Sequence, residues 1–101
     1  MKTKATEKEN YVIVRANGAG VFFGILKEKK NNEVTLTKCR KLFTWYGAAA
    51  VEQIALDGVT EPESCKFTVT VEEITVNNWL QILPCTDKAI KSIKSVKEWK
   101  Q

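Results

Sequence analysis

The stretch from Lys38 to Ala49 holds the residue types best suited to chemistry in this 101-residue chain. Three cations lie between Lys38 and Lys41, and three aromatic residues follow between Phe43 and Tyr46. Gly47 and Ala48 come next, where a helix is expected to begin. Cations bind phosphate, aromatic rings stack on nucleobases, and the unpaired N–H groups of a helix start bind anions. The segment therefore predicts a site for an anionic nucleotide.

The expected helix start strengthens this hypothesis, because no acidic residue lies between Trp45 and Ala49. An acid there would satisfy the positive end of the helix. The acids Glu52 and Asp57 are expected in the middle and at the end of the helix. The alternative is a structural one, in which Thr44 caps the helix and the aromatic residues belong to the core.

We expect phosphate to contact Arg40 and Lys41, a base to stack on Trp45 or Tyr46, and backbone N–H groups to come from Gly47 and Ala48. Arg15 and the C-terminal lysines would complete the pocket from a neighbouring strand or subunit. The candidate ligand-binding residues are therefore Arg15, Arg40, Lys41, Trp45, Tyr46, Gly47 and Ala48.

Ordinary catalysis has little support in the composition. The chain contains no histidine, which excludes serine–histidine and cysteine–histidine catalysis and histidine-ligated metals. Glu72 and Glu73 are adjacent, so on a strand their side chains point to opposite faces. A thiolate nucleophile is the remaining alternative, at Cys39 beside its neighbouring cations or at Cys85. We expect a non-enzymatic protein without catalytic residues, cofactor or metal.

Charge and hydropathy indicate the kind of partner and the cellular compartment. A formal charge of +4 favours anionic partners, although the dispersed acids argue against an extended nucleic-acid track. No apolar run approaches the length of a membrane span, and the start resembles no secretory signal. The three cysteines are widely spaced and fit no disulfide or zinc framework. These features predict a cytoplasmic protein.

Hydrophobic patterning predicts several strands. Residues 11–16 and 21–26 flank an Asn-Gly turn signal, and residues 34–40 alternate apolar and polar side chains. These three strands are expected to form a meander. Two further strands are expected over residues 67–71 and 76–83, the second ended by Pro84.

Two helices are expected. Apolar residues at 48, 51, 54 and 55 share a helix face, and Gly58 follows as a C-terminal cap. Thr86 and Asp87 can begin a second helix. Lysines then recur every third residue from Lys88 to Lys100, a spacing that drifts around a helix. We therefore expect this helix to end near Ser95, with Trp99 docking back in an extended segment.

These elements predict an α+β fold: an antiparallel β-meander or sheet, one central helix packed on it and a short C-terminal helix. Residues 1–10 are polar and are expected to form a flexible tail, and residues 11–101 a single α+β domain.

The sequence also resembles a family of small, mostly uncharacterised proteins of tailed bacteriophages. The matching segments run along nearly the whole chain and are residues 11–15, 19–22, 40–49, 53–55, 58, 65–67 and 82–86. The family pattern at residues 40–48 is Arg-Arg-Leu-Trp-Tyr-Trp-Ser-Gly-Ala. Here Lys41, Phe43, Thr44 and Tyr46 depart from it, and Ala50 and Val51 replace a Ser-Leu pair. Those changes remove one guanidinium and some hydroxyl groups.

The resemblance implies a phage protein that acts in the host cytoplasm, and it supplies no established activity. Small phage proteins of this size often counter host defences, some by sequestering cyclic nucleotide signals. The analogy rests on the shared phage origin and not on a shared binding site. The leading hypothesis is a homo-oligomeric sponge for a cyclic nucleotide immune signal. The second is a protein-binding inhibitor or adaptor that uses a sheet edge or an aromatic surface. The third is a weak nucleic-acid binder.

Overall fold

The computed structural model describes residues 10–100 and contains a seven-stranded sheet, two α-helices and one short 3-10 turn. The strands are β1 (Tyr11–Ala16), β2 (Gly20–Lys30), β3 (Glu33–Thr44), β4 (Lys66–Thr68), β5 (Val71–Asn77), β6 (Trp79–Pro84) and β7 (Glu98–Trp99). The helices are α1 (Val51–Asp57) and α2 (Asp87–Ser95), and the 3-10 turn is η2 (Pro62–Ser64). The expected flexible tail lies outside the described residues apart from Asn10.

The first three strands form the expected antiparallel meander, but β2 and β3 are longer than predicted. The charged segment after Leu26 continues as strand to Lys30 and pairs with the start of β3. Asn31, which has a positive φ of 54°, and Asn32 make the turn. A strand with charged side chains can continue beyond the core because its backbone N–H and carbonyl groups are paired with the neighbouring strand, whatever the side chains are.

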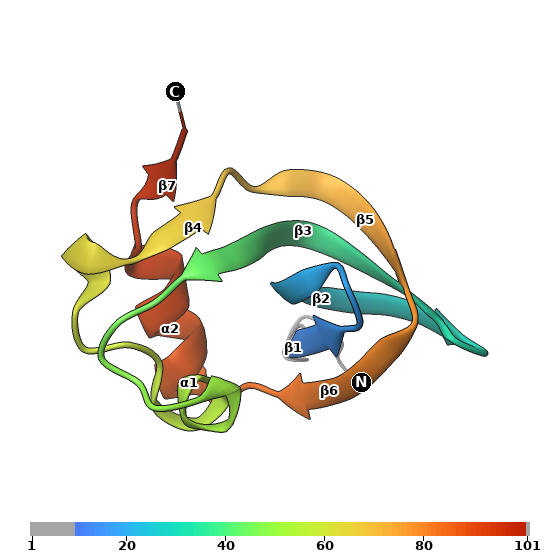
Figure 1. The fold of residues 1–101 in the computed structure, drawn as a ribbon, viewed down its shortest axis with the longest axis horizontal. Helices are drawn as coiled ribbons and strands as arrows, with labels where there is room; N and C mark the ends of the chain where they lie inside the picture. The colour runs from blue at the N-terminus through green and yellow to red at the C-terminus, as the bar shows by residue number, and fades with distance from the viewer. Residues whose placement is uncertain (1–9, 101) are drawn as a thin grey trace, which may run out of the picture.

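The sheet is strongly curled, so that β5, on one side of the meander, continues into β6, on the other side (Figure 1). Its strand order is β6-β1-β2-β3-β4-β7, and β5 also pairs with β3. β5 leads through Asn78 directly into β6, which pairs with β1 on the far side of the meander. The concave side encloses a core cluster, the inner core, which consists of Val12, Val14, Ala16, Phe22, Val34, Leu36, Cys39 and Val76.

A second core lies on the other face of the sheet, beneath the helices. β1 contributes to both cores because successive side chains of a strand alternate between faces: Val12 and Val14 belong to the first, Tyr11 and Ile13 to the second. This double burial explains why the strand reads as a continuous apolar run. The second core also contains Phe23, Leu42, Val51, Ile54, Ala55, Val59, Cys65, Phe67, Ile93 and Val96.

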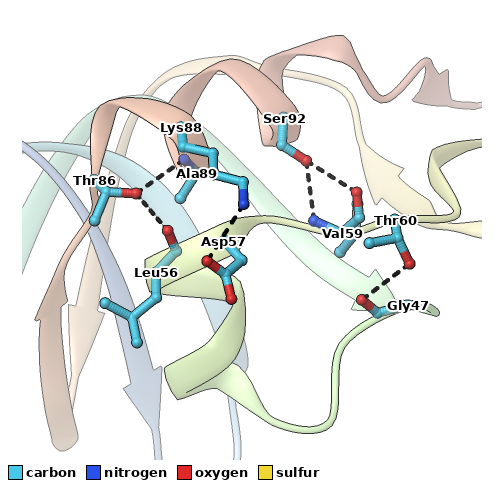
Figure 2. Close-up of polar contacts among 9 residues, drawn as sticks. All are labelled: Gly47, Leu56, Asp57, Val59, Thr60, Thr86, Lys88, Ala89 and Ser92. Carbon is cyan, nitrogen blue, oxygen red and sulfur yellow. Dashed lines mark hydrogen bonds and ion pairs between the residues drawn. The ribbon is translucent and has the colours of Figure 1, made fainter.

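The two helices are joined through side chains of α2 (Figure 2). The Thr86 hydroxyl accepts from the Ala89 N–H at 3.1 Å and donates to the Leu56 carbonyl at 2.6 Å, so one residue caps the start of α2 and the end of α1. The Ser92 hydroxyl bonds both the N–H and the carbonyl of Val59. Gly58, with φ 79°, ends α1 as expected.

The mixed α+β class is thus confirmed, whereas one central helix packed on the sheet is not. The helix predicted from Ala48 begins only at Val51 and has seven residues. The predicted end of the second helix at Ser95 is confirmed, and the chain beyond it is extended. β7 pairs in parallel with β4, so the tail docks back as expected.

Asn78 closes the curled sheet. Its N–H donates to the Asn32 carbonyl at 2.8 Å, and its carbonyl accepts from the Asn17 N–H at 3.1 Å. Its side-chain oxygen accepts from the Asn32 amide at 3.1 Å. One residue therefore ties together the β1–β2 turn, the β2–β3 turn and the β5–β6 connection, and it does so at a φ of 58°.

We expect Asn78→Ala to lower the free energy of unfolding by about 1–2 kcal/mol, because a left-handed backbone disfavours alanine. Asn78→Gly keeps that conformation accessible and should lose clearly less. Urea unfolding measures both, with the exposed neighbour Asn77→Ala as the control. Equal losses for the alanine and glycine variants would contradict a backbone origin.

Candidate functional site

The basic-aromatic segment lies mostly within a strand. β3 runs to Thr44, so neighbouring side chains between Lys38 and Phe43 alternate between the two faces of the sheet. Arg40 points to the face covered by the helices, whereas Lys41 points to the other face, where its Nζ lies 6.0 Å from the Phe22 ring centroid. The two cations expected to share a phosphate are therefore on opposite sides.

Arg40 is almost fully buried, with 4% of its surface exposed. Its Nε donates to the Thr68 carbonyl at 3.0 Å and its Nη2 to the Phe67 carbonyl at 3.1 Å, both in β4. Its Nη1 donates to the carbonyls of Ile93 at 3.2 Å and Val96 at 2.9 Å, at the end of α2. The guanidinium thus joins β4 to the C-terminal segment.

These bonds engage four of the five N–H groups that were expected to hold phosphate, but the positive charge of the guanidinium remains. Burial lowers the pKa of Arg40, and the nearby Glu98 acts in the opposite direction. None of the ion pairs among residues 10–100 involves Arg40. A buried cation bonded to neutral carbonyls still creates a positive potential around it.

The predicted acid-free helix start is wrong. Because α1 begins at Val51, Glu52 lies in its first turn. Ala50 has an extended backbone and caps the helix without a side-chain bond, and the Gln53 side chain accepts from the Ala49 N–H at 2.8 Å. The three alanines favour helix, yet they lie before it, in a segment that bends at Ala49 and Ala50. Glu52 and Gln53 therefore supply the negative charge and the hydrogen-bond acceptor that were expected from an external anion.

The remaining predicted residues are dispersed. Trp45 and Ala48 are half-buried and pack against the core beneath the helices, whereas the Tyr46 side chain is 52% exposed. The Gly47 carbonyl accepts from the Thr60 hydroxyl at 3.3 Å, which ties this loop to the segment after α1 (Figure 2).

Arg15 is exposed on β1 and pairs with Val21 and Gln81. Val21 and Phe22 point to opposite faces, so Arg15 lies on the face opposite Lys41. The structure does not gather the seven candidates into one site.

A cleft that sequence reasoning missed lies beside Arg40, and we call it the basic cleft. It has a volume of about 410 Å³. Its lining residues are Tyr11, Phe23, Lys38, Arg40, Thr70, Lys94, Val96 and Glu98. Tyr11 and Phe23 stack with centroids 5.0 Å apart, and the Lys94 Nζ lies 4.4 Å from the Tyr11 centroid. The cations at Lys38 and Arg40 and the lysine spacing near the C-terminus were its signals in the sequence.

A β-bulge shapes this cleft. Between Arg40 and Thr37 the chain advances three residues, while the paired strand advances two, from Phe23 to Ile25. Lys38 lies in the extra segment with φ 48°. Bulges commonly redirect side chains in this way. Here the bulge reverses the alternation, so that Cys39 enters the inner core and Arg40 faces the cleft.

Glu98 is held at the rim of the basic cleft. Its carboxylate accepts from the Thr70 N–H at 3.1 Å. This bond lowers the pKa of Glu98, and the charges of Arg40 and Lys100 act in the same direction. Glu98 therefore stays ionised, and it is already engaged with the backbone.

The two cysteines considered as nucleophiles are not activated. Burial raises the pKa of Cys39 and of Cys85 to about 12. Cys39 also points away from Arg40, into the inner core. Residues 10–100 contain no group of three or more cysteine or acidic side chains able to hold a metal ion. No helix in that range is long and apolar enough to cross a membrane.

The fold and the cleft describe a small mixed α+β protein with a basic depression between its central strands and its C-terminal segment. The chain belongs to the family described as "Domain of unknown function (DUF6948)", whose model matches residues 9–93. The match covers the sheet through β6 and most of α2, and ends one residue before Lys94. Searches of the curated proteins and of the solved structures each found no match.

We expect Arg40→Lys to lower the free energy of unfolding by about 3 kcal/mol, because a lysine ammonium cannot reproduce the guanidinium fork and leaves buried carbonyls unpaired. Urea unfolding measures the loss, and hydrogen exchange should show the amides of residues 96–99 released first. Arg15→Lys, an exposed change on β1, is the matched control. Unaltered unfolding of the Arg40 variant would contradict the anchoring role.

Cys39 and Cys85 should resist alkylation in the native protein. With a pKa of about 12, roughly one thiol in 10⁴ is ionised at pH 8. Iodoacetamide labelling followed by peptide mass spectrometry should be at least about 100-fold slower than in the guanidinium-unfolded chain. Rapid labelling of either thiol in the folded protein would show an activated cysteine.

Proposed function

We propose that this protein is a non-enzymatic binding protein of a tailed bacteriophage that captures an anionic nucleotide in the basic cleft. The ligand class that fits best is a cyclic nucleotide used as a host immune signal. By holding such a signal in the host cytoplasm, the protein would reduce the concentration that reaches the defence effectors.

The observation that carries this proposal is the charge of the basic cleft. Lys38, Arg40 and Lys94 contribute three positive charges to its lining, and Glu98 contributes one negative charge. Glu98 stays ionised, and three cations against this one carboxylate leave a positive lining that favours an anion. Arg40 adds its charge from the wall, while the ammonium groups of flexible lysines can contact phosphate directly.

The size of the cleft supports a nucleotide over a bare inorganic anion. Tyr11 and Phe23 line the cleft from the core as a stacked pair, but they are only 7% and 2% exposed and offer a base little ring surface. A volume of about 410 Å³ falls within the usual range for small-molecule sites. One small chain covers only part of a ligand, so we expect a homo-oligomer in which a second subunit completes the site.

The phage origin rests on the sequence resemblance, and the role against host defence rests on the analogy with other small phage proteins. A weak nucleic-acid binder remains the third hypothesis. The cleft gives it little support, since a local charge cluster does not form an extended phosphate track.

Isothermal titration calorimetry with cyclic mono-, di- and trinucleotides, linear nucleotides and inorganic phosphate tests the proposal. We expect micromolar or tighter binding of at least one cyclic nucleotide and weak binding of phosphate. Lys94→Gln should weaken binding about tenfold, because it removes a charge-assisted contact.

Lys91→Gln is the matched control, since Lys91 is an exposed lysine of the same helix that does not line the cleft. Its affinity should equal that of the unmodified protein. Absence of heat with every nucleotide at about 100 µM protein would refute the proposal. Equal weakening by both lysine changes would show diffuse charge attraction instead of a site.

A further inference from the structure

Two aromatic rings are exposed at the end of the sheet that carries β7. Phe43, at the end of β3, and Trp99, in β7, stack with centroids 5.0 Å apart at an interplanar angle of 21°. Phe43 is 54% exposed and Trp99 44%. Stacked rings left open to water are frequent at sites of protein association. We call Phe43, Trp99 and the neighbouring Lys66 the aromatic edge.

A second cleft adjoins the aromatic edge. Its volume is about 550 Å³, and it lies between η2 and the C-terminal segment. Its lining residues are Pro62, Glu63, Cys65, Ser95, Lys97, Glu98, Trp99 and Lys100. The Lys66 Nζ lies 5.4 Å from the Trp99 ring centroid. The Lys66 ammonium therefore lies over the exposed Trp99 ring, and Lys97 and Lys100 line the adjoining cleft together with Glu63 and Glu98.

β7 also offers an open strand edge. It is the last strand in the sheet order and pairs only with β4 among the described strands. Figure 1 shows it beside β4 at the rim of the molecule, where the chain leaves the sheet. The outer side of such a strand presents N–H and carbonyl groups that can pair with another chain.

We propose that the aromatic edge binds an extended acidic segment of another protein. The segment adds a strand beside β7 and places an apolar side chain against Trp99 and Phe43. Its carboxylates lie near Lys66, Lys97 and Lys100. This function is separate from nucleotide capture in the basic cleft and uses the other side of the segment 94–100.

Charge favours an acidic peptide at this surface over a second copy of the chain and over a nucleic acid. A second copy of the chain, meeting this surface with its own, would bring the same three lysines together. A nucleic acid would place continuous phosphates against Glu63 and Glu98, which interrupt the basic surface. Spaced carboxylates on an extended peptide match the alternation of lysine and glutamate.

Nuclear magnetic resonance titration of the ¹⁵N-labelled protein with a capped peptide of alternating glutamate and leucine tests the proposal. A peptide with lysine in place of glutamate is the matched probe. We expect the glutamate peptide to shift the amide signals of residues 66–68 and 97–100, with a dissociation constant in the micromolar to millimolar range. The lysine peptide should bind at least about tenfold more weakly.

Variants separate this surface from the rest of the molecule. Phe43→Ser and Trp99→Ala should each weaken peptide binding at least about tenfold, whereas Leu80→Ala, a 55% exposed apolar residue on β6, should leave it unchanged. Lys94→Gln should also leave it unchanged, so failure here is distinct from failure of the nucleotide proposal. The spectrum of each variant shows whether it is folded.

Three outcomes would overturn the proposal. Equal affinity for the two peptides would remove the role of charge. The same amide shifts produced more strongly by oligothymidylate would indicate nucleic acid, and concentration-dependent shifts of these amides without any peptide would indicate a second copy. Absence of shifts with millimolar glutamate peptide would exclude the strand-addition surface.

Discussion

The buried guanidinium of Arg40 is the interaction on which the clefts of this protein depend. It takes a permanent charge out of water, which is costly, and offsets that cost by donating to four carbonyls on β4 and on the C-terminal end of α2. Two of those carbonyls belong to β4 and two lie at the end of α2, where the Ile93 carbonyl also accepts from the Val96 N–H at 3.2 Å. The bonds hold the segment after α2 against β4, and that segment separates the basic cleft from the cleft beside Trp99. One residue therefore positions both proposed binding surfaces.

The position of Arg40 depends on a local break in strand regularity. Leu36 and Cys39 both enter the inner core although they are three residues apart, because the bulge at Lys38 adds one residue to β3. On an uninterrupted strand Arg40 would share the face of Leu36 and enter the inner core. Gly24 faces the bulge across β2, and a Cβ there would lie 3.0 Å from the Thr37 carbonyl oxygen. The glycine gives the bulge its space.

Local patterns predicted much of the fold. The apolar run of β1, the Asn-Gly turn signal, the cap at Thr86 and the end of α2 at Ser95 all agree with the structure. The lysine spacing correctly indicated an extended tail, since a period of three cannot keep one face of a helix. Where prediction failed, at the start of α1, local propensity was overridden. Residues 48–50 favour helix, but long-range pairing extends β3 to Thr44, and the loop that follows is held by Thr60 and Cys65.

The sequence by itself determined the α+β class, the three strands of the meander, the positive charge and the absence of histidine, because composition and periodicity express short-range physics. The strands predicted over 67–71 and 76–83 each span the break between two observed strands. The sequence also identified the segment around Arg40 as the one richest in cations and aromatic residues. Only the tertiary structure decided which face each of them occupies. A strand has a period of two, so a single bulge exchanges its inner and outer side chains. The bulge in turn depends on how Gly24 pairs across the sheet. That register is set by contacts between distant segments, and for this reason Arg40 became a buried anchor, beside which the exposed Lys94 lines the basic cleft.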